Sequence, residues 1–167
     1  GIWEENYLKF ISSNESNGVK TKNNFPIDFN NTFNIVFELS NVSNVEALLG
    51  ERTTNTNGMM IFNYSNSNKL SLDTIGSGTR INVYDRLLAN TRYDISVAFE
   101  NTTVKTYVNG ELGSTMSFKD GKVNFPLTIF TAGNRSNSLG NVYSVKVYNR
   151  ALTQEEIENN YNVDKAR

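Results

Sequence analysis

Apolar and polar residues alternate along most of this chain, and that two-residue period restricts the fold more than any other feature of the sequence. Side chains of a β-strand point alternately to its two faces, so a half-buried strand carries an apolar residue at every second position. The pattern is clearest in Thr32–Leu39, Arg92–Phe99 and Asn141–Tyr148. Shorter segments with strand character are Tyr7–Ile11, Gly18–Lys22, Val45–Leu49, Met59–Asn63, Leu70–Asp73, Thr79–Tyr84, Thr103–Val108, Leu112–Phe118 and Leu127–Thr131.

These segments amount to about twelve short strands at a spacing of roughly 8–15 residues. Such spacing predicts an all-β, two-sheet antiparallel sandwich and argues against an α/β fold. Strict alternation in the last long segment also predicts that Tyr143, Val145 and Val147 share one face, with Val142 on the other.

Turn signals separate the strand segments. Four Asn-Gly or Asp-Gly pairs fit type I′ hairpin turns, in which both central residues need a positive φ. These pairs are Asn17-Gly18, Asn57-Gly58, Asn109-Gly110 and Asp120-Gly121. We expect Ser65–Asn68 and Gly133–Ser138 to be polar loops, because neither shows apolar periodicity.

One helix is predicted near the end of the sequence. Thr153 and Glu156 have the spacing of a capping box, in which each side chain bonds the backbone N–H of the other residue. Leu152 and Ile157 have the spacing of a hydrophobic staple. We therefore expect a short helix over about residues 154–161 that docks on the sandwich through its apolar side.

The residue types exclude several kinds of chemistry. The chain contains no Cys and no His, which rules out disulfides, thiolate or imidazole catalysis and metal sites built from those ligands. Its net charge is −1 and it has no basic run, so we expect no nucleic-acid partner. No apolar stretch approaches the roughly 20 residues that span a bilayer, so we expect no membrane insertion.

The polar composition does not predict disorder. Asparagine is the commonest residue, with 27 copies, yet Leu, Ile, Val and Phe make up about 27% of the chain. Chains that fail to form a core fall below roughly 20%. We expect one domain over residues 1–167. Because the sequence lacks an initial Met and a signal peptide, we expect it to be excised from a larger protein, with neighbouring domains as partners.

The second half of the chain carries motifs that occur together in one superfamily. Val104–Gly110 reads VKTYVNG, Phe125–Ile129 reads FPLTI, and Gly140–Thr153 reads GNVYSVKVYNRALT, followed by Glu155-Glu156-Ile157. This order resembles the laminin G-like, concanavalin A-like lectin/glucanase superfamily in its bacterial and phage members. The N-terminal half fits more loosely, through Thr32–Leu39 and Met59–Tyr64. The resemblance implies a jelly roll of two curved antiparallel sheets, as found in lectins, carbohydrate-binding modules, adhesion domains and some glycosidases.

A glycosidase is one alternative. Glucanases of this superfamily carry a Glu-x-Asp-x-x-Glu strand, which sets two carboxylates across the scissile bond. This motif is absent, and the nearest acidic cluster, Glu155-Glu156-x-Glu158, falls in the predicted helix, where the helix dipole accounts for it. We therefore expect a non-catalytic domain.

Calcium is a possible cofactor, because the resemblance implies oxygen-ligated Ca²⁺ in some members and calcium prefers such hard ligands. The candidate ligands are Asp28 with Asn30 and Asn31, or Asp120 beside its glycine turn. An ordinary turn role explains these aspartates equally well.

The resemblance also implies a ligand site on loops that flank the concave face. These loops are expected to be Glu51–Gly58, Ser65–Asn68, Gly76–Arg80 and Gly133–Leu139. Amides both donate and accept hydrogen bonds, guanidinium groups suit acidic sugars, and aromatic rings stack on sugars. The candidate ligand-binding residues are Arg52, Asn55, Asn57, Tyr64, Asn66, Arg80, Tyr84, Arg135 and Asn137.

The sequence therefore favours a non-catalytic carbohydrate-binding or adhesion module that binds a glycan or cell-surface polysaccharide. It is expected in an extracellular bacterial protein, at the cell surface, or in a phage tail particle. The alternative is a protein-interaction or assembly domain without a glycan site, which should expose a large apolar patch instead.

Overall fold

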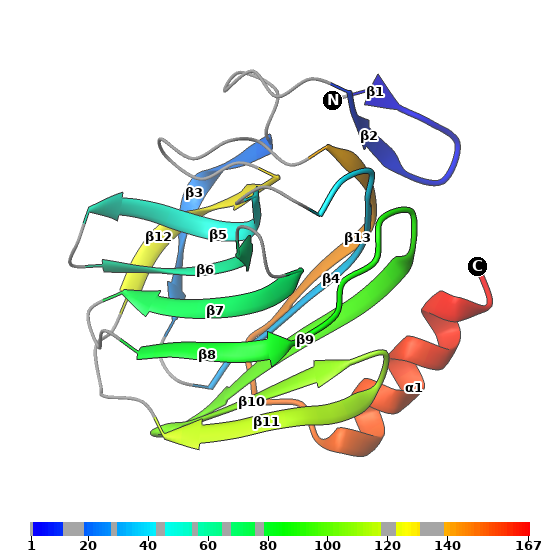
Figure 1. Ribbon diagram of the computed structural model, residues 1–167. Helices are drawn as coiled ribbons and strands as arrows, with labels where there is room; N and C mark the ends of the chain where they lie inside the picture. The colour runs from blue at the N-terminus through cyan, green and yellow to red at the C-terminus, as the bar shows by residue number, and fades with distance from the viewer. Residues whose placement is uncertain are drawn as a thin grey trace.

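The computed structural model describes residues 2–11, 19–27, 30–42, 46–54, 57–64, 68–75, 79–117, 123–130 and 139–167. Thirteen strands over these residues form two antiparallel sheets that face each other, and one helix follows the last strand. Figure 1 shows the two sheets as layers, with the helix outside one of them. The predicted all-β jelly-roll sandwich with a short C-terminal helix is thereby confirmed.

The first sheet has seven strands in the order β1-β2-β13-β4-β9-β10-β11. Their bounds are β1 Ile2–Trp3, β2 Leu8–Phe10, β13 Gly140–Tyr148, β4 Thr32–Leu39, β9 Arg92–Glu100, β10 Thr103–Val108 and β11 Glu111–Ser117. Of these strands, β1 has no counterpart among the predicted segments. The hairpin of β10 and β11 turns at Asn109-Gly110, whose φ values of 53° and 83° confirm the predicted positive-φ turn.

The second sheet has six strands in the order β3-β12-β5-β6-β7-β8. Their bounds are β3 Val19–Ile27, β12 Val123–Ile129, β5 Glu46–Thr54, β6 Asn57–Tyr64, β7 Lys69–Ile75 and β8 Thr79–Tyr84. The two sheets approach each other at β8 and β11. There, Ser114 Oγ donates to the carbonyl oxygen of Asn82 at 3.1 Å.

The hydrophobic core lies between the sheets. Alternate residues of β4 and β9 point into it, and the segments across from them supply leucines and isoleucines. The largest fully buried side chains are Phe10, Phe33, Phe37, Phe99 and Phe130. Burial of each such ring stabilises the sandwich by roughly 1.5–3 kcal/mol.

The helix α1 (Gln154–Lys165) lies on the outer face of the seven-stranded sheet. Its predicted capping box is present, with Thr153 as N-cap and Glu156 returning a bond to the Thr153 N–H at 3.0 Å. Ile157 is buried with Ala98, Tyr107 and Leu152. The helix runs about one turn further than predicted, and it is not long and apolar enough to cross a membrane.

Two local predictions were wrong. Asn57-Gly58 is not a turn and Glu51–Gly58 is not a loop, because β5 extends to Thr54 and pairs there with Asn57 at the start of β6. Pairing of Gly58 on both sides, with β5 and with β7, outweighs the local turn preference. The turn pairs Asn17-Gly18 and Asp120-Gly121 and the loop Gly133–Ser138 lie outside the described residues.

The second error concerns β13. The pairing of β13 with β4 shifts register between Val142 and Ser144, so Tyr143 is an extra, bulged residue. Val142 consequently packs in the core with Val145 and Val147, and Tyr143 lies on the outer face, where its hydroxyl donates to Glu38 Oε2 at 3.2 Å. A bulge inserts one residue and reverses the alternation beyond it, which a strict period of two does not anticipate.

Candidate functional site

The outer face of β7 and β8 is the candidate ligand surface. Leu70 and Leu72 of β7 and Ile81 of β8 point into the core. The alternate positions of the two strands therefore point to the sheet's outer face, and they carry the polar residues Lys69, Ser71, Asp73, Arg80 and Asn82. Four of these side chains line a shallow cavity of about 320 Å³, namely Lys69, Ser71, Arg80 and Asn82.

Arg80 is held in place by Asp73, its neighbour across the β7–β8 pairing. Arg80 Nε donates to Asp73 Oδ1 at 3.0 Å and Nη2 donates to Oδ2 at 2.9 Å. This two-bond geometry fixes the plane of the guanidinium group. Because 46% of the Arg80 side chain remains exposed, the oriented group is accessible from the cavity.

A second polar set lies beside this pair. Asn82 Nδ2 donates to Asp85 Oδ1 at 2.7 Å, and Lys69 Nζ lies 3.2 Å from the same oxygen. The hydrogen bond from Asn82 is the largest cause that lowers the pKa of Asp85 below its ordinary value, and the bond from Lys69 is the next. The carboxylate therefore stays ionised at neutral pH, and it keeps Asn82 and Lys69 together at the cavity edge.

This face offers what a hydroxyl-rich ligand needs. Guanidinium, amide, ammonium and hydroxyl groups donate hydrogen bonds, while carboxylate, amide and hydroxyl oxygens accept them. Each basic group that lines the cavity is paired with a carboxylate, so the described part of the face presents ion pairs and no uncompensated cation. Such a surface fits a neutral sugar better than an acidic one.

The structure separates two of the predicted site residues. Arg80 lines the cavity, but Tyr84 packs against the core and against Tyr93, with ring centroids 5.6 Å apart. The cause is a second bulge: Leu70 pairs with Tyr84 and Ser71 pairs with Asn82, which leaves Val83 as an extra residue. Arg80 and Tyr84 therefore point to different sides of the sheet.

The other predicted site residues are only partly described. Arg52 is in β5, and Asn57 and Tyr64 are in β6, the strand next to β7. Tyr64 pairs through its backbone with Lys69, so its position adjoins the cavity. Asn55, Asn66, Arg135 and Asn137 lie outside the described residues.

Four residues of this face were not singled out from the sequence. They are Lys69, Ser71, Asp73 and Asn82, which lie within strands, whereas the predicted site consists of loops and adjoining strand ends. The alternation around Leu70, Leu72 and Ile81 was the available signal, because it assigns their polar neighbours to the outer face.

The calcium prediction stays a prediction. Asp28 and Asp120 lie outside the described residues, and Asn30 is exposed. Over the part of the chain that the structure describes, no three acidic side chains gather closely enough to hold a metal ion. Carboxylates are the ligands that most strongly favour calcium, so a site would depend on the two aspartates beyond this part.

Comparison with known proteins places the chain in a family. A family model for the concanavalin A-like lectin/glucanases superfamily matches residues 13–158, so the chain belongs to this superfamily. The resemblance inferred from the YVNG and YNRAL motifs is thereby confirmed. No curated protein matches the chain.

Several solved structures share the fold. A carbohydrate-binding module (CBM40) of the Ruminococcus gnavus IT-sialidase, bound to α2,3-sialyllactose, has a TM-score of 0.66 at 11% identity, over 86% of this chain and 96% of that one. A SAP-like pentraxin from Limulus polyphemus has a TM-score of 0.66 at 13% identity, over 84% and 73%. Botulinum neurotoxin type C, whose cell entry depends on two ganglioside molecules, has a TM-score of 0.65 at 15% identity, over 83% and 36%. At these identities the likeness shows the fold alone.

Proposed function

We propose that this domain is a non-catalytic carbohydrate-binding module that binds a neutral glycan on the outer face of β7 and β8. The observation that carries the proposal is the cavity lined by Lys69, Ser71, Arg80 and Asn82, whose polar groups are oriented by Asp73 and Asp85. A sugar presents several hydroxyls at once, and a fixed array of donors and acceptors matches them.

The comparisons support the ligand class. The sialidase module is bound to sialyllactose, and the type C neurotoxin depends on gangliosides. Both fold as this chain does, so a glycan is the first ligand class to test. For this chain we favour a neutral sugar because both basic groups that the structure describes at the cavity are already paired with carboxylates.

The carboxyl groups described on this face give an electrostatic reason to propose binding without catalysis. A glycosidase needs one carboxylic acid that is protonated near neutral pH, beside a second carboxylate. Asp73 is ion-paired with Arg80, and the pKa of Asp85 is lowered by Asn82 and Lys69. Among the side chains that the structure describes on this face, neither carboxyl group is therefore arranged as a general acid.

An assembly domain is the second candidate, and the described surface favours it less. Its exposed large apolar side chains are Ile11, Val19, Leu88, Leu112, Met116 and Val163. They come from five separate segments of the chain, and single exposed apolar residues are normal on a soluble protein. We also propose an extracellular, cell-surface or phage-particle location for the domain.

A glycan array tests the proposal. We expect the unmodified domain to bind at least one neutral glycan, and Arg80→Ala and Asn82→Ala each to lose that signal. Lys105→Ala is the matched control, because Lys105 forms a similar exposed ion pair with Glu100 on the other sheet. Thermal unfolding checks that each variant is folded. Binding that survives both substitutions, or no binding to any glycan, contradicts the proposal. Repeating the array in EDTA tests the calcium prediction separately.

A further inference from the structure

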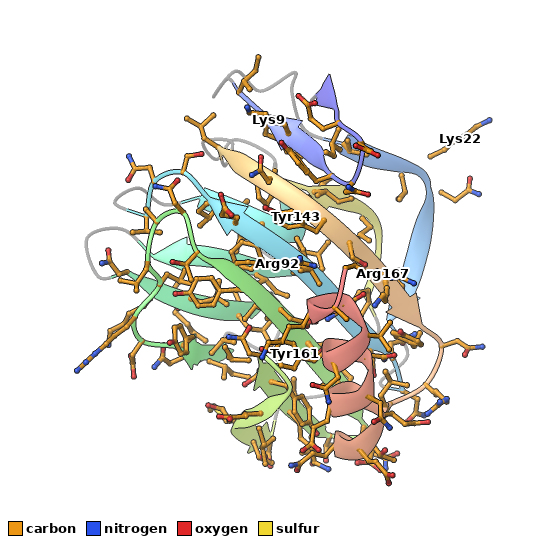
Figure 2. The ribbon with its side chains drawn as sticks, turned by 90° about the vertical axis from the view of Figure 1, so that its right-hand side faces the viewer. Lys9, Lys22, Arg92, Tyr143, Tyr161 and Arg167 are labelled. Atoms are coloured by element: carbon orange, nitrogen blue, oxygen red, sulfur yellow. The ribbon has the colours of Figure 1, made fainter. Side chains whose placement is uncertain are left out.

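A cleft separates α1 from the β9–β11 strands, and it reaches Val83 and Tyr84 at the end of β8. It consists of two cavities, of about 200 Å³ and about 500 Å³. Both are lined by Asn109, Tyr161 and Lys165, so the two cavities adjoin along these side chains. In Figure 2, Tyr161 lies on α1 and Arg92 lies beside the helix on the sheet. The combined volume falls within the roughly 300–1,000 Å³ typical of small-molecule sites.

The floor of the cleft is rigid. The Asn109 N–H donates to the carbonyl oxygen of Asp94 at 2.8 Å, and the Asp94 N–H donates to Asn109 Oδ1 at 3.0 Å. The following residue, Gly110, has a φ of 83°, and its backbone lies directly against the ring of Tyr161. These contacts tie the hairpin turn to both β9 and α1, so the cleft needs little ordering when a ligand enters.

Asp94, one of the residues that line the smaller cavity, carries an unpartnered buried acceptor. Asp94 is 4% exposed, and its Oδ1 accepts a hydrogen bond from Asn34 Nδ2 at 2.5 Å. Its Oδ2 has no hydrogen-bond partner, although Asp94 lines the cavity. A buried carboxylate oxygen without a donor is costly, and a ligand that supplies an O–H or N–H there removes that cost.

The charges around this oxygen are balanced. Arg92 and Lys165 bring positive charge to the cavity, and Asp94 and Asp164 bring negative charge. Asp164 is in turn paired with Lys146, and the Arg92 guanidinium donates to the Asp164 carbonyl oxygen at 2.8 Å. Neither a bare metal cation nor a strong anion fits such a mixture. A neutral ligand with several hydroxyls does, because it can donate to Asp94 and accept from Arg92 or Lys165.

The larger cavity adds an apolar wall. Tyr84 and Leu112 line it together with the ring of Tyr161, and Glu111 supplies a carboxylate at its rim. Leu112 is 47% exposed, which leaves an apolar surface open to solvent beside polar groups. Sugars carry apolar C–H faces as well as hydroxyls, so a wall of this mixed kind suits a pyranose ring.

We infer that the cleft between α1 and the β10–β11 hairpin is a second binding site, which takes a neutral pyranose sugar whose hydroxyl donates to Asp94 Oδ2. The site shares its ligand class with the proposed function but none of its residues. The domain therefore holds two separate sugar sites and can link two glycan chains.

NMR titration tests this inference. The probes are the methyl glycosides of glucose, galactose and N-acetylglucosamine, added to millimolar concentration. We expect saturable shifts of the Asn109 and Gly110 amides and of the Tyr161 ring. Asp94→Asn replaces an acceptor by a group that can donate, and should weaken binding at least about tenfold. Tyr161→Leu keeps an apolar contact with Gly110 but removes the ring, and should weaken binding as well. Val163→Ser, an exposed change on α1 that lines neither cavity, should leave the titration unchanged.

Three results would overturn the inference. The first is the absence of saturable shifts at the cleft with every glycoside. The second is undiminished affinity in a folded Asp94→Asn or Tyr161→Leu variant. The third is an equal response of the cleft to calcium or sodium chloride alone, which would identify Asp94 Oδ2 as a cation ligand. The Arg80→Ala/Asn82→Ala protein distinguishes the two proposals. If the NMR shifts of the cleft residues persist in this variant, they support the second site, even where the variant no longer binds on the glycan array.

Discussion

The ring of Tyr161 lies so close to Gly110 that a Cβ atom at position 110 would stand 3.0 Å from Tyr161 Cδ1. Gly110 also adopts a φ of 83°, which side-chain-bearing residues rarely tolerate. The hairpin turn and the helix can therefore pack this closely only because residue 110 has no side chain.

Replacing Gly110 by alanine should lower the free energy of unfolding by about 2 kcal/mol, because it adds backbone strain and a contact with Tyr161. Urea unfolding measures the change. In a Tyr161→Ala background the same replacement should cost less, since only the backbone strain remains. An equal cost in both backgrounds would show that the ring contact is unimportant.

Arg80→Lys should weaken glycan binding about five- to tenfold while the domain stays stable. Lysine keeps the charge but cannot reproduce the two bonds to Asp73 that orient the guanidinium group. An exposed ion pair contributes less than about 1 kcal/mol, so the unfolding midpoint should hardly move. Surface plasmon resonance on the best array glycan measures the affinity. Unchanged affinity would mean that Arg80 acts only as a charge, or not at all.

Asp94 should make the domain more stable in mild acid than at neutral pH. Burial raises the pKa of Asp94 from 3.8 to about 6, and Asp164 adds to the rise. A raised acid pKa favours the folded state at low pH, and this contribution is lost as the pH increases from about 4 to about 6. The loss is about 3 kcal/mol at most.

Comparison with Asp94→Asn isolates this effect from other carboxylates. The difference in unfolding free energy between the two proteins should change as the pH increases from about 4 to about 6, and it should be constant at higher pH. A difference that is constant from pH 4 to pH 7 would show that Asp94 titrates normally.

Glu156 should affect the pH dependence of stability in the opposite direction from Asp94, and at lower pH. Its bonds with Arg150, and then with the Thr153 N–H, lower its pKa from 4.5 to about 2. A lowered acid pKa stabilises the folded state above about pH 4.5, and the contribution disappears as the pH falls towards 2. Glu156→Gln should therefore unfold more easily than the unmodified domain at pH 7 and equally easily near pH 2. Thermal melts at both pH values measure this, with Glu158→Gln as the control.

Much of the fold was predictable because it depends on local patterns. The alternation in Thr32–Leu39 and Thr79–Tyr84 gave strands with the observed bounds, and Asn109-Gly110 gave the observed turn. Thr153 and Glu156 located the helix start, since a capping box involves only residues of one turn. The same alternation indicates that Lys69 and Asp73 lie on the outer face.

The bulges at Tyr143 and Val83 could not be read from the sequence in this way. A bulge depends on how two strands pair, and each strand alone shows only its own period. The bulge at Val83 is what divides Arg80 from Tyr84 and assigns them to different cavities. The extra pairing of Gly58 likewise overrode a good local turn signal.

The sequence by itself determined the two-sheet fold, the capped helix and the superfamily, because these follow from residue period, residue type and local motif. The tertiary structure decided which polar residues meet. Asp94 and Asn109 meet through the pairing of β9 with β10, and only the docking of α1 on the seven-stranded sheet brings Tyr161, from far along the chain, to the same cleft. Burial beneath that helix, which no local pattern contains, is also what raises the pKa of Asp94.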